Sequence, residues 1–193
     1  MQSVCVFCGS RPGSRPDYLD AAKQLGRVLA SSGRTLVYGG ASIGMMGALA
    51  DAALEAGGRV IGVMPHGLAR REIAHGFLTE FHAVGSMHER KALMEKRSDG
   101  FIAMPGGFGT LDETFEIITW AQLGMHTKPV GFLNVRGFFD PLMQMVENAI
   151  ESGFVPAEHR ALLLVDSEAE DLLSKMDNYV APTITGRKMS TGV

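Results

Sequence analysis

Cysteine is scarce in this sequence, and histidine never occurs at the spacing of metal ligands. The two cysteines, Cys5 and Cys8, form a C-x-x-C pair. They lie within a predicted strand, where side chains three residues apart point to opposite faces, and not at the helix start that a redox pair uses. No second cysteine pair completes a zinc site. We therefore expect two buried, unreactive thiols and no bound metal.

Long apolar runs and an excess of positive charge are also missing. No apolar run approaches the ~18 residues that span a bilayer. The first residues run straight into an apolar strand, without a basic segment or a cleavage site, so we predict no signal peptide and a cytoplasmic location. The net charge of −3 does not favour nucleic acid or an anionic membrane as a partner.

The sequence does contain a regular alternation of short apolar runs and helical periodicity. We expect strands at 3–8, 35–38, 59–64, 81–84, 101–104, 130–133 and 162–165. We expect helices at 18–32, 45–56, 87–97, 110–123, 138–152 and 168–180. This order predicts an α/β fold, with one Rossmann-like, doubly wound parallel sheet and helices on both faces. We expect a single domain over residues 1–180 and a disordered tail over 181–193.

Three glycine-rich turns directly follow predicted strands. They occupy residues 9–14, 39–47 and 105–110. Glycine lets the backbone approach a ligand closely, and the amides at the start of the next helix can point at an anion. Ligands of parallel sheets bind beyond the carboxyl ends of the strands, which is where all three turns should lie. The turns therefore predict a phosphate-binding site.

The spacing of the residues in these turns excludes the two commonest protein classes that contain such turns, the P-loop NTPases and the dinucleotide-binding enzymes. Gly39 and Gly44 begin like a P-loop, but Met45 and Met46 stand where a lysine and a hydroxyl residue are required. The first turn lacks G-x-G-x-x-G, and the strand that ends at Met64 offers no acid for a ribose hydroxyl. A magnesium-dependent NTPase and a dinucleotide enzyme are therefore not expected.

Acidic residues follow the third turn, on the helix that it opens. Thr110 and Glu113 fit a capping box, and in that alternative Glu113 has only a structural role. The apolar residues that should meet the sheet are Leu111, Phe115 and Ile118. Glu113, Glu116 and Trp120 would then share the opposite face, where the two acids have no basic partner at i+4. A Trp on such a face is typical of an interface, which predicts a site against a second subunit.

Basic residues open the helix that precedes the third turn. Arg90 can donate a planar fork to a phosphate or a base edge, and Lys91 supplies a point charge. Cations near a helix start oppose the helix dipole, which favours a functional role over a plain surface pair. For Lys96 and Arg97 we prefer a solvated helix face, and His88 receives no role.

Together, these motifs resemble the LOG ("Lonely Guy") family of cytokinin riboside 5′-monophosphate phosphoribohydrolases, whose members often carry the name "lysine decarboxylase-like". The family signature P-G-G-x-G-T-x-x-E stands at 105–113, and its companion M-H-x-R-K stands at 87–91. The resemblance extends from about Val4 to Val180, and the two motifs are specific in combination.

The resemblance implies hydrolysis of the N-glycosidic bond of a nucleoside 5′-monophosphate, without a cofactor. It implies Arg90 and Glu113 as the catalytic pair, and a homodimer with the site near the subunit interface. The substrate-binding positions that it implies are Glu72, Lys91, Gly107, Phe108, Gly109, Thr110, Glu116 and Thr119.

Physical reasoning fits that chemistry and leaves alternatives open. Loss of the base develops positive charge on the sugar, which the Glu113 carboxylate can stabilise, or it can activate water. A nucleotide-binding carrier or sensor without catalysis is the first alternative, although it gains nothing from acids beside an anion. Amino-acid decarboxylation needs a Schiff-base lysine, and the only candidate, Lys91, fits a phosphate better. The preferred base stays open, and methionines that can line its pocket are Met45, Met46, Met87 and Met104.

Overall fold

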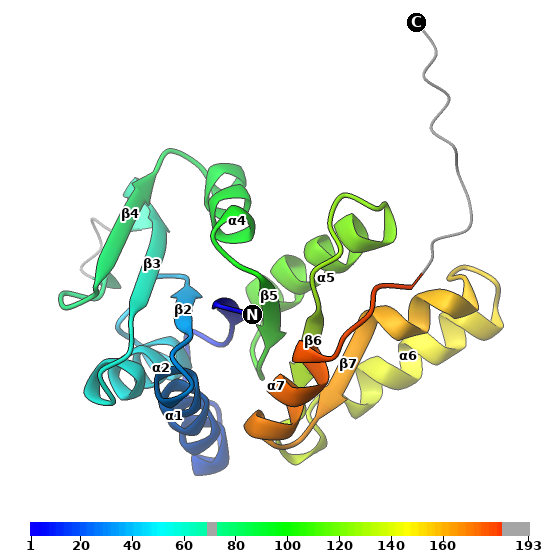
Figure 1. Ribbon diagram of the computed structural model, residues 1–193, viewed down its shortest axis with the longest axis horizontal. Helices are drawn as coiled ribbons and strands as arrows, with labels where there is room; N and C mark the ends of the chain where they lie inside the picture. The colour runs from blue at the N-terminus through cyan, green and yellow to red at the C-terminus, as the bar shows by residue number, and fades with distance from the viewer. Residues whose placement is uncertain (69–72, 183–193) are drawn as a thin grey trace, which may run out of the picture.

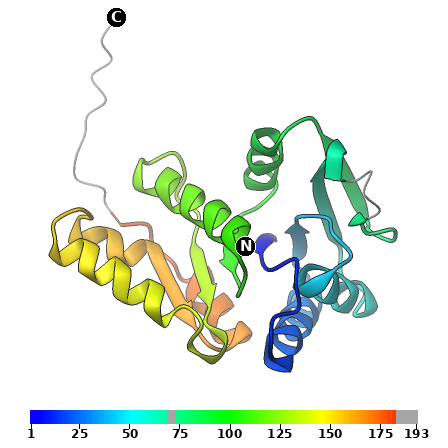
Figure 2. The ribbon, with the colours of Figure 1, turned by 180° about the vertical axis from the view of Figure 1, so that it is seen from behind.

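The computed structural model of the chain describes residues 1–68 and 73–182. Its centre is a seven-stranded sheet in the order β4-β3-β2-β1-β5-β6-β7. All neighbouring strands run parallel, and helices lie on both sides of the sheet (Figures 1 and 2). This arrangement confirms the predicted fold class.

The strands and helices match the predicted alternation closely. The strands are β1 Ser3–Phe7, β2 Thr35–Tyr38, β3 Val60–Pro65, β4 Glu80–Val84, β5 Gly100–Ala103, β6 Val130–Leu133 and β7 Leu163–Asp166. The helices are α1 Pro16–Ser31, α2 Gly44–Glu55, α3 His66–Leu68, α4 Met87–Lys96, α5 Phe108–Gln122, α6 Asp140–Glu151 and α7 Ala169–Asp177. Two 3₁₀ turns, Val135–Gly137 and Ala157–Leu162, precede α6 and β7. Most boundaries shift by one to three residues, which is the usual uncertainty of helix and strand ends.

Three differences from the prediction bear on local structure. The one-turn helix α3 lies between the third and fourth predicted strands, where no helix was expected. Helix α6 starts two residues later than predicted, because the chain first turns at Arg136, whose φ is 57°. The last helix ends at Asp177, and of the predicted disordered tail only residues 181 and 182 are described, in neither helix nor strand.

Two apolar layers hold the sheet between the helices. Val4 and Val6 of β1 pack with α1, α2 and α7, whereas Cys5 and Phe7 pack with α4 and α5. The alternation follows from the pleat, which turns successive side chains to opposite faces. Cys5 and Cys8 are both buried free thiols and lie on opposite faces, as predicted. Burial raises the pKa of both thiols, so they stay protonated and unreactive.

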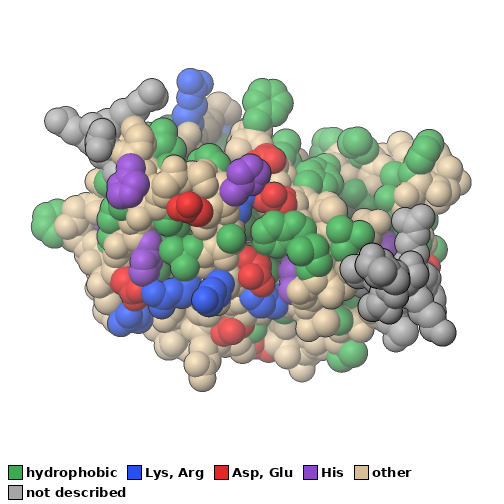
Figure 3. Space-filling model, turned by 90° about the horizontal axis from the view of Figure 1, so that it is seen from above, with side chains coloured by type: hydrophobic (Ala, Val, Ile, Leu, Met, Phe, Trp, Pro, Cys, Tyr) green, Lys and Arg blue, Asp and Glu red, His purple; other side chains and the backbone are tan. Residues whose placement is uncertain are grey.

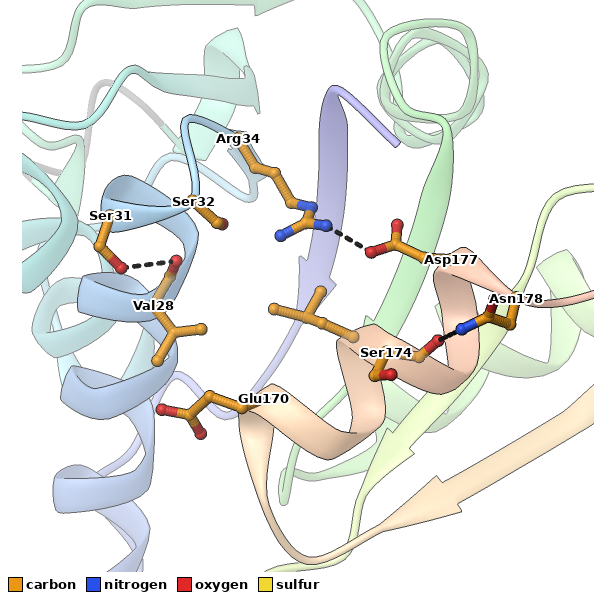
Figure 4. A pocket seen from close by; sticks show the side chains of 9 residues that line it. Val28, Ser31, Ser32, Arg34, Glu170, Ser174, Asp177 and Asn178 are labelled. Carbon is orange, nitrogen blue, oxygen red and sulfur yellow. Dashed lines mark hydrogen bonds and ion pairs between the residues drawn. The ribbon is translucent and has the colours of Figure 1, made fainter.

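A cavity of about 380 Å³ separates α1 from α7, and charged side chains cross it (Figure 4). Arg34 donates a 2.6 Å hydrogen bond from Nη2 to Oδ2 of Asp177. The ammonium group of Met1 lies 3.3 Å from Oδ1 of the same carboxylate. These two contacts tie the start of the sheet to its last helix.

Neither a membrane-crossing helix nor a metal-binding cluster occurs within residues 1–68 and 73–182. No helix in these ranges is long and apolar enough to span a bilayer. No group of three or more His, Cys, Asp and Glu side chains in them is placed to hold a metal ion.

Candidate active site

The three glycine-rich turns meet at the carboxyl ends of the central strands. The amide of Gly9 donates to the carbonyl of Pro105 at 3.1 Å, which joins the turns after β1 and β5. The amide of Met45 donates to the carbonyl of Gly9 at 3.1 Å, which brings in the turn after β2. Strands β1 and β5 are neighbours at the point where the strand order reverses, the usual ligand-binding position of such sheets. The predicted convergence of the turns is confirmed.

Helix α5 starts earlier than the capping box predicts. Its N-cap is Gly107, in an extended conformation, so Thr110 already lies inside the first turn. Glu113 does not reach back to cap the helix, because its carboxylate is held by Arg90. The capping role predicted for Thr110 and Glu113 is therefore wrong. The amides of Phe108, Gly109 and Thr110 have no acceptor among the described residues and are free to bind an anion.

Gly107 and Gly109 have no steric reason of their own to be glycine. A Cβ at either position would meet nothing within 4 Å, and neither has a positive φ. Gly106 differs, because a Cβ there would lie 2.1 Å from Oγ1 of Thr110. The backbone at Gly107 and Gly109 is therefore open to the close approach of a ligand.

Arg90 and Glu113 form a buried ion pair between α4 and α5. Nη1 of Arg90 donates to Oε1 of Glu113, and Nε donates to the carbonyl of Val63 at 3.1 Å. The two residues are only 9% and 7% exposed. Gly39 leaves room for the guanidinium, since a Cβ there would lie 2.4 Å from Nη2. The structure thus brings together the two residues predicted as catalytic.

The prediction of which α5 face meets the sheet is partly wrong. The buried face includes Glu113, together with Thr110, Thr114, Ile117, Ile118 and Ala121, whereas Phe115 is 38% exposed. Oγ1 of Thr114 donates to the backbone carbonyl of Thr110, so the Thr114 hydroxyl can be buried. Glu113 is tolerated inside because Arg90 neutralises it.

Burial and Arg90 act on the Glu113 carboxyl in opposite directions. Burial disfavours the charged form, and the Arg90 cation favours it. Burial dominates, so the pKa of Glu113 lies above the ordinary value of 4.5. A carboxyl in such surroundings is typical of an acid–base residue.

Lys91 follows Arg90 on α4 and pairs with two carboxylates of α5. Its Nζ is 2.7 Å from Oδ2 of Asp112 and 2.9 Å from Oε2 of Glu116. Burial opposes the charge of Lys91, but the two carboxylates outweigh it and raise the lysine pKa. Glu116 therefore has a basic partner, although one from another helix, which sequence spacing alone does not reveal.

A cavity of about 440 Å³ opens beside these groups. Its polar wall holds Arg90 and Glu113 and the start of α5, residues 107–110. Its apolar wall consists of Ile43, Met46, Met64, Leu68, Ile73 and Met87. Of the methionines predicted for a base pocket, Met46 and Met87 line this cavity, Met45 does not, and Met104 is fully buried.

The remaining predicted binding residues lie away from this cavity or outside the described residues. Lys91 and Glu116 do not line the cavity but pair with each other at its edge. Thr119 is exposed on α5, where its Oγ1 donates to the carbonyl of Phe115 at 2.7 Å. Glu72 lies outside the described residues. Sequence reasoning missed Met64 and Ile73, which carry no motif signal and reach the site only through the fold.

The chain is similar to named phosphoribohydrolases over most of its length. It is 51% identical to the probable cytokinin riboside 5′-monophosphate phosphoribohydrolase LOGL5 of Oryza sativa subsp. japonica over 179 residues, which is 93% of this chain and 73% of that protein. It is 49% identical to the cytokinin riboside 5′-monophosphate phosphoribohydrolase LOG1 of Arabidopsis thaliana over 177 residues, 92% of this chain and 83% of that protein.

Solved structures share the fold at low sequence identity. The molybdenum cofactor binding protein of Rippkaea orientalis has a TM-score of 0.67 and 24% identity, covering 91% of this chain and 95% of that one. The molybdenum cofactor carrier protein of Chlamydomonas reinhardtii has a TM-score of 0.66 and 22% identity, covering 92% and 96%. At this identity the likeness shows the fold alone.

A family model described as "Possible lysine decarboxylase" matches residues 46–176, which include both sequence motifs and the Arg90–Glu113 pair. This match and the close relatives agree with the arrangement of the site, and the chain belongs to the LOG family of cytokinin riboside 5′-monophosphate phosphoribohydrolases.

Proposed function

We propose that this protein hydrolyses the N-glycosidic bond of adenosine 5′-monophosphate or its N6-modified forms, releasing the free base and ribose 5-phosphate. One observation carries the proposal: a buried Arg90–Glu113 pair and the free amides at the start of α5 line the same cavity. The names of the relatives at about half identity support the same reaction.

In the proposed reaction, the bond between C1′ of the ribose and the ring nitrogen of the base breaks. The electron pair leaves with the base, and water gives its hydroxyl to C1′ and a proton to the base. The Glu113 carboxylate stabilises the positive sugar or activates the water. Arg90 holds that carboxylate through Nη1 and orients the departing base.

The phosphate is proposed to bind at the start of α5, on the same polar wall of the cavity. The free amides at 108–110 and the positive end of the α5 dipole attract an anion. Lys91 reaches the phosphate by leaving Asp112, while Glu116 turns to the ribose hydroxyls. Contacts from Glu72 and Thr119 remain proposals that rest on the family resemblance.

The function is tested by incubating the protein with AMP and with N6-isopentenyl-AMP and following base release by chromatography. We expect base and ribose 5-phosphate in equal amounts, and comparing kcat/KM for the two nucleotides defines the preferred base. Nucleotide binding without base release would support the carrier alternative. An absorbance spectrum of the purified protein with a pyridoxal phosphate band would support decarboxylation instead.

Replacing Gly107 with Ala should weaken nucleotide binding without destabilising the protein. The new methyl group meets no protein atom, but it occupies the space in which a ligand approaches the backbone. We expect AMP affinity to fall about tenfold or more, equivalent to roughly 1.4 kcal/mol, with an unchanged Tm. Gly76→Ala is the matched control, because a Cβ there also meets nothing and Gly76 lies outside the cavity. Equal affinities of the two variants would contradict a phosphate site at Gly107.

The pH dependence of kcat/KM should reflect the perturbed Glu113 carboxyl. The proposed role needs the ionised form, so activity falls as the pH drops through the pKa of Glu113. Because burial raises that pKa, the acidic limb of the profile should lie above the ordinary glutamate value of 4.5. A limb at or below that value would show that another group controls the rate.

We also propose a homodimer formed through α5 and the turn that follows it. The exposed apolar side chains there are Phe108, Phe115, Leu123 and Met125, and Figure 3 shows apolar and acidic side chains adjoining on the face seen from above. Several exposed apolar side chains on one helix and its following turn favour a partner. Trp120, from which the sequence analysis predicted this interface, is half-buried against the core of its own subunit.

Sedimentation velocity tests the dimer. We expect the wild type to sediment as a dimer and Leu123→Asp to shift it toward a monomer. Phe77→Asp changes an exposed apolar side chain that lies before β4, outside α5 and the turn after it, and should leave the dimer intact. A monomeric wild type would overturn the proposal. The cytoplasmic location remains a prediction from the sequence.

A further inference from the structure

A second cavity, of about 510 Å³, lies on the other side of the turn after β5. The turns after β1 and β5 form its backbone walls, and Tyr18, Phe108 and Phe138 supply aromatic rings. It shares Gly9, Ser10, Gly107 and Phe108 with the cavity beside Glu113. Neither Arg90 nor Glu113 reaches it, so the proposed hydrolysis does not account for this cavity.

The aromatic wall of this cavity is held in place by the core. Tyr18 and Phe138 pack edge to face, with centroids 6.0 Å apart. Phe138 packs in the same way on the buried Phe139, at 5.0 Å, and Phe139 packs on Phe132 at 5.1 Å. This chain of rings leads from the cavity into the sheet, so the wall exists before any ligand binds.

The turn after β1 is shaped to admit the Tyr18 ring. Gly13 has a φ of +78°, and a Cβ there would lie 2.5 Å from Cδ2 of Tyr18. A side chain at position 13 would therefore be strained and would displace the ring. Gly13 therefore leaves the space that the Tyr18 ring occupies in the aromatic wall.

Charge at the cavity is of one sign. Arg11 lines it, and its exposed side chain has no hydrogen bond or ion pair with any described residue. No Asp or Glu is among the lining residues. The cavity between α1 and α7 differs, because Arg34 there is already paired with Asp177 (Figure 4). A free guanidinium beside aromatic walls suits a flat ring that carries a negative group.

We propose that this cavity binds a second ligand of the nucleotide class, separate from the molecule beside Glu113. Its ring lies against Tyr18 and Phe138, and its anionic group pairs with Arg11. Because Gly107 and Phe108 line both cavities, the occupant contacts the same turn that forms the proposed phosphate site. Using AMP as the probe rests on the proposed function, but the cavity argument does not.

Equilibrium dialysis of AMP against the Glu113→Gln variant tests the proposal, since slow turnover preserves the probe. We expect two classes of AMP site per chain. Arg11→Gln, added to that background, should weaken one class about tenfold or more, the loss expected for a charge-assisted hydrogen bond. Arg15→Gln is the matched control, an exposed cation four residues along that does not line the cavity. It should leave both classes unchanged.

A second pair of variants tests the aromatic wall. Phe138→Leu should weaken the same class as Arg11→Gln, whereas Phe154→Leu, at an exposed Phe outside the cavity, should not. Thermal unfolding verifies that each variant is folded. Binding of only one AMP per chain would overturn the proposal. So would two classes of site whose affinities are both unchanged by Arg11→Gln. Base release by the wild type is measured separately, so two AMP sites without base release would count against the proposed reaction alone.

Discussion

Replacing Glu113 with Gln should lower kcat for base release by about 10²–10⁴-fold, the usual contribution of a catalytic acid–base group. The amide is nearly isosteric, and its oxygen can still accept the hydrogen bond from Arg90. The variant therefore keeps the geometry of the cavity but loses the negative charge that faces the sugar. KM for AMP should change little, because Glu113 acts mainly in the transition state.

A matched control separates loss of charge at the site from loss of an ion pair in general. Glu95→Gln removes a carboxylate that pairs with Lys128 and does not line the cavity. We expect this variant to release base at the wild-type rate. If Glu113→Gln also retained near wild-type kcat, Glu113 would be a structural partner of Arg90 and not a catalytic residue.

Replacing Arg90 with Ala should cost about 3–5 kcal/mol of unfolding free energy, the typical loss when one partner of a buried ion pair is removed. The change leaves the Glu113 carboxylate buried without a cation and the carbonyl of Val63 without its donor. Urea unfolding monitored by circular dichroism measures the loss. Base release should disappear in the same variant, even where the protein remains folded.

Two further variants show whether the cost comes from the stranded charge. Arg97→Ala removes a cation from the more exposed pair with Glu80 and should cause a much smaller loss. The double change Arg90→Met with Glu113→Met removes both buried charges and should recover most of the stability, but no activity. A double variant as unstable as Arg90→Ala would indicate that packing around Arg90 matters more than charge.

The parts of the fold that sequence predicts well depend on local signals. Each strand is a short apolar run, and each helix carries apolar residues at helical spacing. Both signals can be recognised from residues that are close together in the sequence. The glycine-rich turns follow strands directly. Because the strands of a parallel sheet all end at the same edge, the predicted sheet was enough to predict that the turns meet there. Arg90 and Glu113 were found by motif, and the fold explains why they meet.

The parts that sequence did not predict depend on partners far along the chain. Apolar periodicity placed Glu113 on the outer face of α5, because nothing near it in sequence reveals that Arg90 will neutralise it. Preference for Thr as an N-cap favoured Thr110 over Gly107, yet the cap is the glycine. The aromatic cavity joins Tyr18 to Phe138, and neither residue belongs to a motif.

The hydrogen bond between Gly9 and Pro105 also has a consequence for the order of folding. Strands β1 to β4 come from the first part of the chain and form one half of the sheet, with β1 at its edge. Strand β5 is the first strand of the second half. The edge at β1 is paired only when β5 has formed, for example where Val4 lies opposite Gly100. Contacts this distant in sequence form late and slow the folding of the chain. Both cavities are lined by the turns after β1 and β5, so they form only when the two halves of the sheet pair. Ligands should therefore bind only after the two halves have joined.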